Sequence, residues 1–271
     1  MLTSKQLTDI KELQQACEAS ESFELKLNWD MLKTRTGKDK EDFFYYEDEK
    51  LVGFIGLYGF GNKVEICGMV HPDFRRKGIF TGLYHEALHE VKEKGYRKVL
   101  LNAPTNSKSA KGFLETIPCK YSLSEYQMKW EETELNISED VTLKLSAPDD
   151  FELEVQLEVQ CFGFEEEEAR AFNTQRFDDD QYLIILFNGK AVGKIRVSHL
   201  DGEAGIYGFA VLPEFQGNGI GRKALTNIVI KEHKAGFPIF LEVEAKNAHA
   251  LRLYESCGFR AYHSQDYYEI V

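Results

Sequence analysis

The sequence lacks the features of disulfide scaffolds, metal-binding modules and membrane proteins. No apolar run approaches the roughly 18 to 20 residues that span a bilayer, and the first residues contain no secretory hydrophobic region. The cysteines number 5, are scattered, and show no close CxxC spacing, which supports neither a disulfide framework nor a zinc site. We therefore expect a cytoplasmic protein with no metal and no membrane partner.

The chain also lacks an excess of basic residues, with 33 Lys and Arg against 45 Asp and Glu. Residues 1–135 hold 20 basic against 22 acidic residues and residues 136–271 hold 13 against 23, so the formal charges are −2 and −10. A nucleic-acid partner would require a basic surface, which the second half does not offer. A cationic small molecule or a basic peptide is the better match, although acidic surface also serves solubility alone.

The chain contains an internal repeat, and its 271 residues suffice for two domains. The segment 70–79, VHPDFRRKGI, matches 211–220, VLPEFQGNGI, at an offset of 219 − 78 = 141. Asn106 and Asn247 share this offset, whereas Val52 and Val192 are offset by 140. We expect an N-terminal copy at 1–132, a polar linker at 133–140 and a C-terminal copy at 141–271.

The C-terminal copy shows alternating strand and helix signals. Apolar runs at 181–187, 191–198 and 204–211, separated by the turns Asn188-Gly189 and Asp201-Gly202, predict three antiparallel strands. They are followed by a helix to about Lys234 and a strand at 239–243. After these come a helix that Asn247 can cap and a strand at 259–270. This order predicts an α/β fold with a mixed sheet flanked by helices, whose ligand lies at the carboxyl ends of parallel strands.

A glycine-rich turn, Gln216-Gly217-Asn218-Gly219-Ile220-Gly221, joins a strand to a helix start. Backbone N–H groups without large side chains form an anion site there, with Arg222 and Lys223 as nearby positive charges. A dinucleotide fingerprint would need glycine at position 222, and a P-loop would need Gly-Lys-Ser/Thr. Pyrophosphate remains the natural ligand.

Residues 211–221 and the segment 247–259, NAHALRLYESCGF, together resemble the GCN5-related N-acetyltransferase (GNAT) superfamily. The resemblance covers about residues 140–271 well and residues 1–132 more weakly, so it implies two tandem GNAT-like domains. It also implies acetyl-CoA as co-substrate, with its pantetheine along the strand that contains Phe209 and ends at Val211. The pyrophosphate would lie on the loop of Gln216, Gly217, Asn218, Gly219, Ile220, Gly221 and Arg222, with Asn247 beside the thioester.

The resemblance assigns the chemistry to two further side chains. Tyr254 would protonate the departing thiolate, and a backbone N–H near Val211 would stabilise the oxyanion. Glu242 resembles the base of ribosomal-protein N-terminal acetyltransferases, in which a tyrosine twelve residues later is the acid; here 254 − 242 = 12. Glu244 and a water relay are alternative bases, because both glutamates lie on one side of a strand. Asn247 as a mere helix cap and Tyr254 as a mere core aromatic are the structural alternatives.

The N-terminal copy departs from this pattern at two positions. Phe80 stands where the C-terminal copy has Gly221, and Phe113 stands where it has Tyr254. Gly78 is retained, and the basic triplet Arg75, Arg76 and Lys77 could still hold a phosphate. We interpret this copy as structural or substrate-shaping.

The acceptor is expected to be a primary amine. The resemblance implies that the region 161–180, with acidic runs at 165–168 and 178–180, lines the acceptor side of the cleft, although such runs are usually solvated helix surface. An alternative to catalysis is a CoA-binding module without turnover in one or both copies, and another acyl-CoA could replace acetyl-CoA. The two copies could pack as a monomeric pseudo-dimer or form a homodimer.

Overall fold

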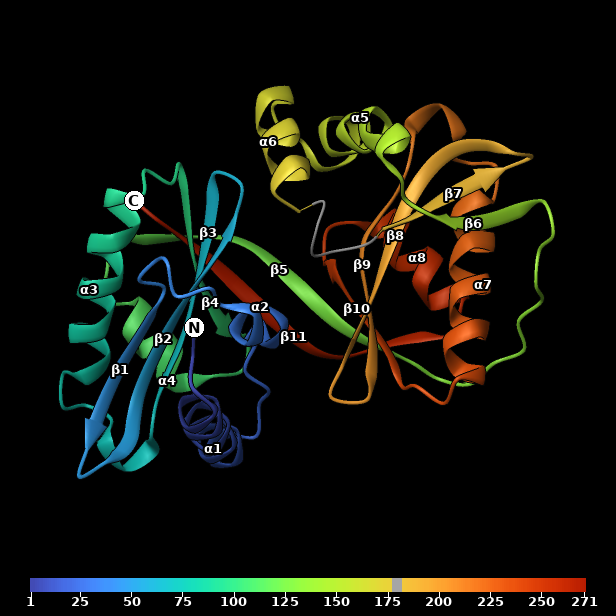
Figure 1. The fold of residues 1–271 in the computed structure, drawn as a ribbon. Coiled ribbons are helices and arrows are strands. Elements are labelled where there is room, and N and C mark those ends of the chain that lie inside the picture. Colours follow the sequence, from blue (N-terminus) through green and yellow to red (C-terminus); the bar gives the residue numbers. More distant parts are fainter. Residues whose placement is uncertain (177–181) are drawn as a thin grey trace. The chain divides into compact units, whose positions relative to one another are not determined.

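The computed structural model describes residues 1–176 and 182–271 and divides the chain into two compact units (Figure 1). Unit 1 comprises Met1–Glu125 together with His263–Val271, and unit 2 comprises Tyr126–Tyr262. Each unit contains a mixed sheet with helices, so the predicted α/β fold is confirmed. The predicted first residue of one strand, Gln181, lies outside the described residues.

In unit 1, the strand order is β1-β2-β3-β4-β11-β5. The pair β3/β4 is parallel, and the pairs β1/β2, β2/β3 and β11/β4 are antiparallel. A capping box of Thr3 and Gln6 begins the first helix. The elements are α1 (Ser4–Glu21), α2 (Trp29–Thr34), β1 (Asp42–Glu47), β2 (Lys50–Phe60), β3 (Lys63–Val70), η1 (Pro72–Phe74), α3 (Ile79–Glu93), β4 (Lys98–Pro104), α4 (Lys108–Leu114) and β5 (Cys119–Trp130).

Both faces of the unit 1 sheet are covered by helices. On one face, Leu83 and Ala87 of α3 pack with Ile55 and Ile66 of the sheet. On the other face, Ile10 of α1 joins a second buried cluster that includes Phe54 and Met69. Alternate residues of β2 and β3 therefore enter different cores, which explains why these strands are apolar almost throughout.

In unit 2, the strand order is β5-β10-β9-β8-β7-β6. The pair β10/β9 is parallel and the β6/β7, β7/β8 and β8/β9 pairs are antiparallel, as the sequence predicted for β7 to β10. The elements are β6 (Val141–Leu145), η2 (Pro148–Asp150), α5 (Phe151–Phe162), α6 (Glu166–Arg176), β7 (Leu183–Phe187), β8 (Lys190–Leu200), β9 (Glu203–Val211), η3 (Pro213–Phe215), α7 (Ile220–Lys234), β10 (Ile239–Glu244), α8 (Ala248–Ser256) and β11 (Phe259–Ile270).

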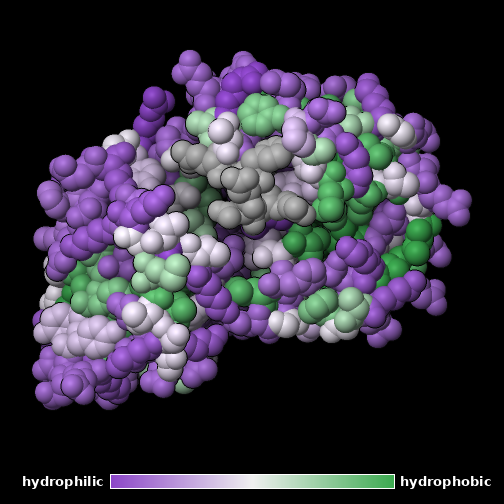
Figure 2. All heavy atoms as spheres, in the orientation of Figure 1, coloured by the Kyte–Doolittle hydropathy of each residue, from purple (hydrophilic) through white to green (hydrophobic). Residues whose placement is uncertain are grey.

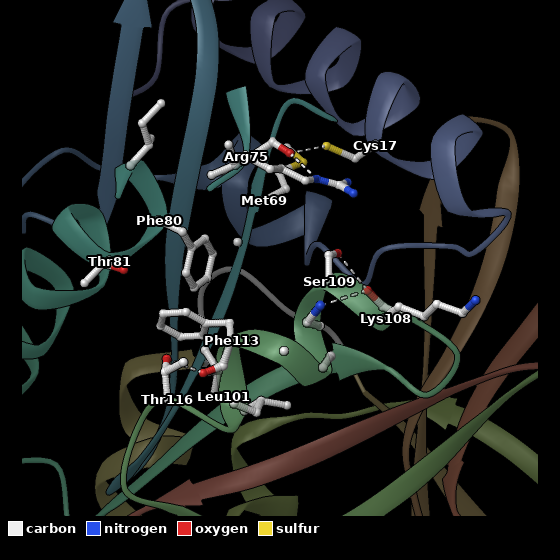
Figure 3. A pocket seen from close by; sticks show the side chains of 18 of the residues that line it. Cys17, Met69, Arg75, Phe80, Thr81, Leu101, Lys108, Ser109, Phe113 and Thr116 are labelled. Carbon is white, nitrogen blue, oxygen red and sulfur yellow. Dashed lines mark hydrogen bonds between the residues drawn. The ribbon is translucent and has the colours of Figure 1, made fainter. Parts of the chain in front are cut away.

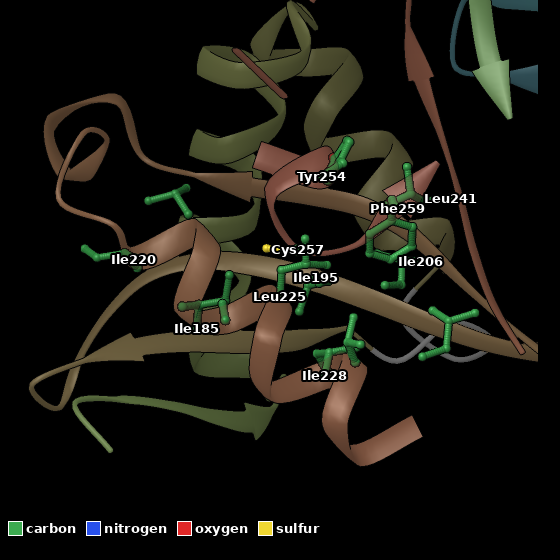
Figure 4. Close-up of a cluster of buried hydrophobic side chains, with 14 of the residues drawn as sticks. Ile185, Ile195, Ile206, Ile220, Leu225, Ile228, Leu241, Tyr254, Cys257 and Phe259 are labelled. Atoms are coloured by element: carbon green, nitrogen blue, oxygen red, sulfur yellow. The ribbon is translucent and has the colours of Figure 1, made fainter. Parts of the chain in front are cut away.

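The main core of unit 2 lies between α7, α8 and one face of its sheet (Figure 4). Ile220, Leu225 and Ile228 of α7 pack there on Ile206 and Leu241, with Phe259 fully buried. A smaller cluster lies on the opposite face, where α5 contributes Leu157 and β9 contributes Ala210. The carboxyl ends of β9 and β10 thus emerge between helices, where a ligand is expected.

Two strands continue from one unit into the other. Strand β5 begins in unit 1 and ends in unit 2, whereas β11 begins in unit 2 and ends in unit 1. Residues 131–138 form no helix or strand. Unit 1 is therefore built from two separate stretches of the chain, so the compact units are not identical with the two copies of the repeat.

Most of the molecular face shown in Figure 2 is hydrophilic. Within residues 1–176 and 182–271, no helix combines the length and the apolar character required to cross a membrane. The same residues contain no group of three or more His, Cys, Asp or Glu side chains that could hold a metal ion.

Candidate acyl-transfer site

The parallel strands β9 and β10 separate before they end. Their register runs from Ala204 opposite Ile239 to Ile206 opposite Leu241, although β9 continues to Val211 and β10 to Glu244. The last residues of both strands therefore face a split in the sheet. A strand edge with free backbone groups can pair with an extended ligand that carries amide groups.

Strand β9 contains a β-bulge within this split. Lys194 of β8 lies opposite Ala210 and Arg196 opposite Tyr207, so Gly208 and Phe209 together face Ile195 alone. Gly208 has a φ of +54°, a left-handed conformation that glycine adopts without strain. A bulge interrupts the ladder and leaves a residue unpaired, so it can direct backbone N–H groups toward a ligand.

The bulge accounts for the change of offset in the repeat. In unit 1, β3 has 8 residues and pairs one to one with β2 over its whole described length, from Val70 opposite Gly53 to Lys63 opposite Phe60. In unit 2, β9 has 9 residues between equivalent ends. The offset rises from 140 to 141 because Gly208 and Phe209 together correspond to the single residue Gly68, which faces Ile55 in the N-terminal copy.

The glycine-rich loop follows directly after β9 and η3. Gly217 and Gly219 have φ angles of +77° and +74°, and a Cβ on either glycine would meet no atom within 4 Å. The side chain of Gln216 donates to the Val211 carbonyl at 2.8 Å, and Asn218 donates to the Phe215 carbonyl at 3.2 Å. These bonds hold the loop open at the N-terminus of α7, where partial positive charge favours an anion.

Of the two positive charges expected near the loop, Arg222 and Lys223, one is paired within the protein. Arg222 is exposed, but Lys223 forms an ion pair with Asp140.

Gly221 is not required sterically, because its Cβ would lie at an ordinary 3.5 Å from Phe209 and Leu253. In unit 1 the aromatic residue comes from the helix instead: Phe80 lies near Gly68, the counterpart of Phe209. The ring of Phe80, on α3, therefore takes the place that the ring of Phe209, on β9, has in unit 2.

Tyr254 lies on α8, which follows β10, and Asn247 directly precedes this helix. The Asn247 side chain accepts from the Ala250 N–H at 3.0 Å, so its predicted role as a helix cap is confirmed. Tyr254 is 8 % exposed within the main core, with its ring 6.5 Å from that of Phe209. Burial raises the pKa of Tyr254 to about 12, so the phenol keeps its proton at neutral pH.

Glu242 and Glu244 lie on the face of β10 opposite to Leu241 and Val243, which enter the main core. The prediction that both glutamates share a side is therefore confirmed. Glu242 is half-buried and accepts from Gln127 of β5 at 3.4 Å, whereas Glu244 is exposed. The structure places Glu242 on the face of the sheet opposite to the main core, which contains Tyr254.

The acidic run 165–168 enters α6. Arg170 contacts both Glu166, at 3.0 Å, and Glu152 of α5, at 2.8 Å, so part of this charge is neutralised within the helices. The second run, 178–180, lies outside the described residues. Buried Lys194 and its carboxylate partners Glu154 and Glu158, which lie beneath the bulge, were not predicted from the sequence.

Unit 1 has a cavity of about 830 Å³ at the equivalent split between β3 and β4 (Figure 3). Phe80 and Phe113, whose ring centroids are 4.6 Å apart, form part of its wall. Arg76, the counterpart of Gly217, has a φ of +64°, and Gly78 has a φ of +79°. The loop therefore keeps the conformation of its C-terminal counterpart although one glycine is lost.

The polar groups of this cavity differ from those of unit 2. Arg75 is held by Glu21 and donates to the Val70 carbonyl at 3.1 Å, as Gln216 does to Val211. Asn102 lines the cavity, and its buried Nδ2 atom has no hydrogen-bond partner among the described residues. An unsatisfied buried donor favours a ligand with a carbonyl group.

The comparisons with known proteins agree with this architecture. The model of the acetyltransferase (GNAT) family matches residues 7–116 and 151–259. The [ribosomal protein bS18]-alanine N-acetyltransferase of Escherichia coli (strain K12) is 38 % identical over 73 residues, which cover 27 % of this chain and only about half, 49 %, of that enzyme. The mycothiol acetyltransferase of Brachybacterium faecium is 28 % identical over 235 residues, or 78 % of this chain and 68 % of that protein.

A solved GCN5-related N-acetyltransferase from Sphaerobacter thermophilus has a similar fold, with a TM-score of 0.76 at 19 % identity. The match covers 96 % of this chain and 91 % of that one. The two family matches fall on the two halves of the repeat, which confirms its tandem nature. The chain belongs to the acetyltransferase (GNAT) family.

Proposed function

We propose that the chain is an acetyl-CoA-dependent N-acetyltransferase whose reacting centre is the split between β9 and β10. The family implies an acyl-CoA co-substrate. The observation that carries the proposal is the bulge at Gly208, which occurs in β9 and not in its counterpart β3, both of which are described in full. The same copy has the open glycine loop and Tyr254.

The donor would lie along β9. Its pantetheine amides would pair with the free strand edge from Phe209 to Val211, and its pyrophosphate would contact the N–H groups of 216–221, with Arg222 as counter-charge. Asn247 offers its remaining amide N–H groups, because its carbonyl oxygen already caps α8. These assignments extend the observed geometry to a bound ligand.

The reaction would be direct transfer. The neutral amine attacks the thioester carbonyl, the new C–N bond forms, the C–S bond breaks, and the nitrogen loses a proton. Backbone N–H groups at the bulge would stabilise the oxyanion, and Tyr254 would protonate the thiolate. Glu242 is the proposed base, since it is half-buried next to the split, with Glu244 or a water relay as the alternatives.

The acceptor would be a primary amine on a small molecule or a basic peptide. The Escherichia coli relative is named for alanine in a ribosomal protein and the Brachybacterium relative for mycothiol, so the two relatives favour no single class of acceptor. The acidic balance of residues 136–271 supports a cationic acceptor.

A second function is favoured for unit 1, namely binding of a CoA thioester without turnover. Its cavity of about 830 Å³ and the retained loop conformation at Arg76 and Gly78 support binding. The regular pairing of β3 and the phenyl ring of Phe113 would remove oxyanion stabilisation and the acid.

Calorimetric titration with acetyl-CoA tests both proposals. Gly219→Trp and Gly78→Trp are matched variants, because both glycines have nearly equal φ angles and open space where the side chain would be. Two sites in the wild type, each abolished by one variant, with turnover in an amine screen lost only in Gly219→Trp, would support both proposals. No binding would exclude the acetyltransferase, and turnover that survives Gly219→Trp would place the reaction elsewhere.

A further inference from the structure

Unit 2 contains a buried charged network that the proposed reaction does not use. The Lys194 side chain of β8 is 0 % exposed, and its ammonium group contacts the carboxylates of Glu158 and, at 3.8 Å, Glu154. It also lies 4.4 Å from the ring centroid of Tyr182. Removing three charges from water carries a large desolvation penalty, which makes such a network weak evidence for stability alone.

The network lies directly against the bulge. Lys194 is in register with Ala210, the residue that follows the two bulged positions. Tyr182 packs against the bulge itself, since a Cβ on Gly208 would lie 2.7 Å from its Cε1 atom. The Tyr182 ring is thus fixed between the Lys194 ammonium and the backbone of Gly208.

Helix α5 contacts the end of β9 with the same face that carries the two carboxylates. Glu154, Leu157, Glu158 and Cys161 follow the i, i+3, i+4, i+7 spacing of one helix face. Leu157 packs with Ala210, and the Cys161 thiol lies 3.5 Å from the Val211 carbonyl. The carboxylates and these apolar contacts therefore hold the end of β9.

The two copies differ in the network and the bulge together. Phe54, in register with Met69, takes the place of Lys194 in unit 1 and packs on Phe44 at 5.3 Å. There the strand is regular. The copy that replaces the buried lysine by an apolar side chain is the copy whose strand has no bulge.

We propose that Lys194, Glu154, Glu158 and Tyr182 form a positioning network that holds the β9 bulge in the conformation needed to polarise the thioester carbonyl. The inference rests on the proposed acetyltransferase function. The network touches no substrate and acts through the backbone of 208–210. Its charges are retained for geometry, because an apolar cluster would fill the same volume without the desolvation penalty.

The test replaces the whole network in the full-length protein. The triple variant Lys194→Met, Glu154→Gln and Glu158→Gln removes both sides of the two ion pairs together. We expect kcat to fall about 100-fold with the best amine acceptor, while the Kd for acetyl-CoA changes less than twofold, because misplacement of reacting groups affects the transition state.

With [1-13C]acetyl-CoA alone, the infrared downshift of the bound carbonyl stretch should shrink. Tyr182→Leu, which keeps all charges, should show the same pattern to a smaller degree.

A matched control is available on the same strand. His199 of β8 contacts buried Glu232 of α7 at 2.7 Å, and the double variant His199→Gln and Glu232→Gln should leave kcat and the carbonyl stretch unchanged. A folded triple variant or Tyr182→Leu variant with wild-type kcat and carbonyl stretch would overturn the inference, as would equal losses in the control. Failure of the wild type to bind acetyl-CoA would remove the proposed function and this inference with it.

Discussion

At the scale of single residues, the strongest kinetic test concerns Tyr254. Tyr254→Phe keeps the ring that packs near Phe209 and Phe259 and removes only the hydroxyl. We expect kcat to fall about 100-fold or more, with the Kd for acetyl-CoA nearly unchanged, because a general acid acts mainly in the transition state. Tyr84→Phe, another buried tyrosine, is the control, and equal losses of kcat and affinity would contradict the assigned role.

The same residue gives a prediction on pH and stability. Burial raises the Tyr254 pKa from 10.0 to about 12, so the unfolded chain loses this proton before the folded chain does. The stabilisation is complete below pH 10 and is lost as the pH rises toward 12, by about 2 to 3 kcal/mol at the end. Urea unfolding at pH 9 and pH 11 should therefore show a smaller loss for Tyr254→Phe than for the wild type. Parallel losses would show that the phenol is not buried as described.

At the scale of elements, the bulge can be removed by deleting Gly208. The deletion would give β9 the length and offset of β3, whose regular pairing shows that this fold tolerates an eight-residue strand. We expect a folded protein that still binds acetyl-CoA but whose kcat is lower by about 100-fold or more, the effect of losing an oxyanion donor. Gly202→Asn, at a φ of +83° in the turn after β8, is the control for a change in the same hairpin that keeps its length and its bulge. Wild-type kcat in the Gly208 deletion would exclude the bulge from catalysis.

The sequence predicted the elements from β7 to β11, and it contained the signal for the bulge. Turn dipeptides and apolar runs mark those strands, and the change of offset from 140 to 141 records the extra residue, but only the pairing locates it at the bulge of Gly208 and Phe209. The sequence analysis did not predict α5, whose inward face carries Glu154 and Glu158. Buried carboxylates resemble a solvated surface in the sequence, because their partner Lys194 lies far along the chain.

At the scale of the whole molecule, the sequence cannot show which copy each final strand completes. Strands β5 and β11 hold equivalent places in the repeat, so either could follow its own copy. In the structure, Gln265–Glu269 of β11 pair with β4 of unit 1. The distribution of β5 and β11 between the units depends on particular long-range contacts, such as that of Tyr267 with Glu125 and Lys26.

Truncation after Tyr262 tests this dependence of unit 1 on the end of the chain. Tyr267 is 1 % exposed, its hydroxyl donates to Glu125 at 2.6 Å, and Asp266 accepts from Thr105 at 2.9 Å. Losing the strand would expose the β4 edge and leave Lys26 and Glu125 without their tyrosine, a cost of about 3 to 5 kcal/mol or more for the aromatic residue alone. Hydrogen exchange should show unit 1 strands unprotected while α7 and β8 stay protected, and a synthetic 259–271 peptide should restore protection. A truncated protein with full protection in β3 and β4 would show that unit 1 folds without β11, and would support the continuous domain limits expected from the repeat.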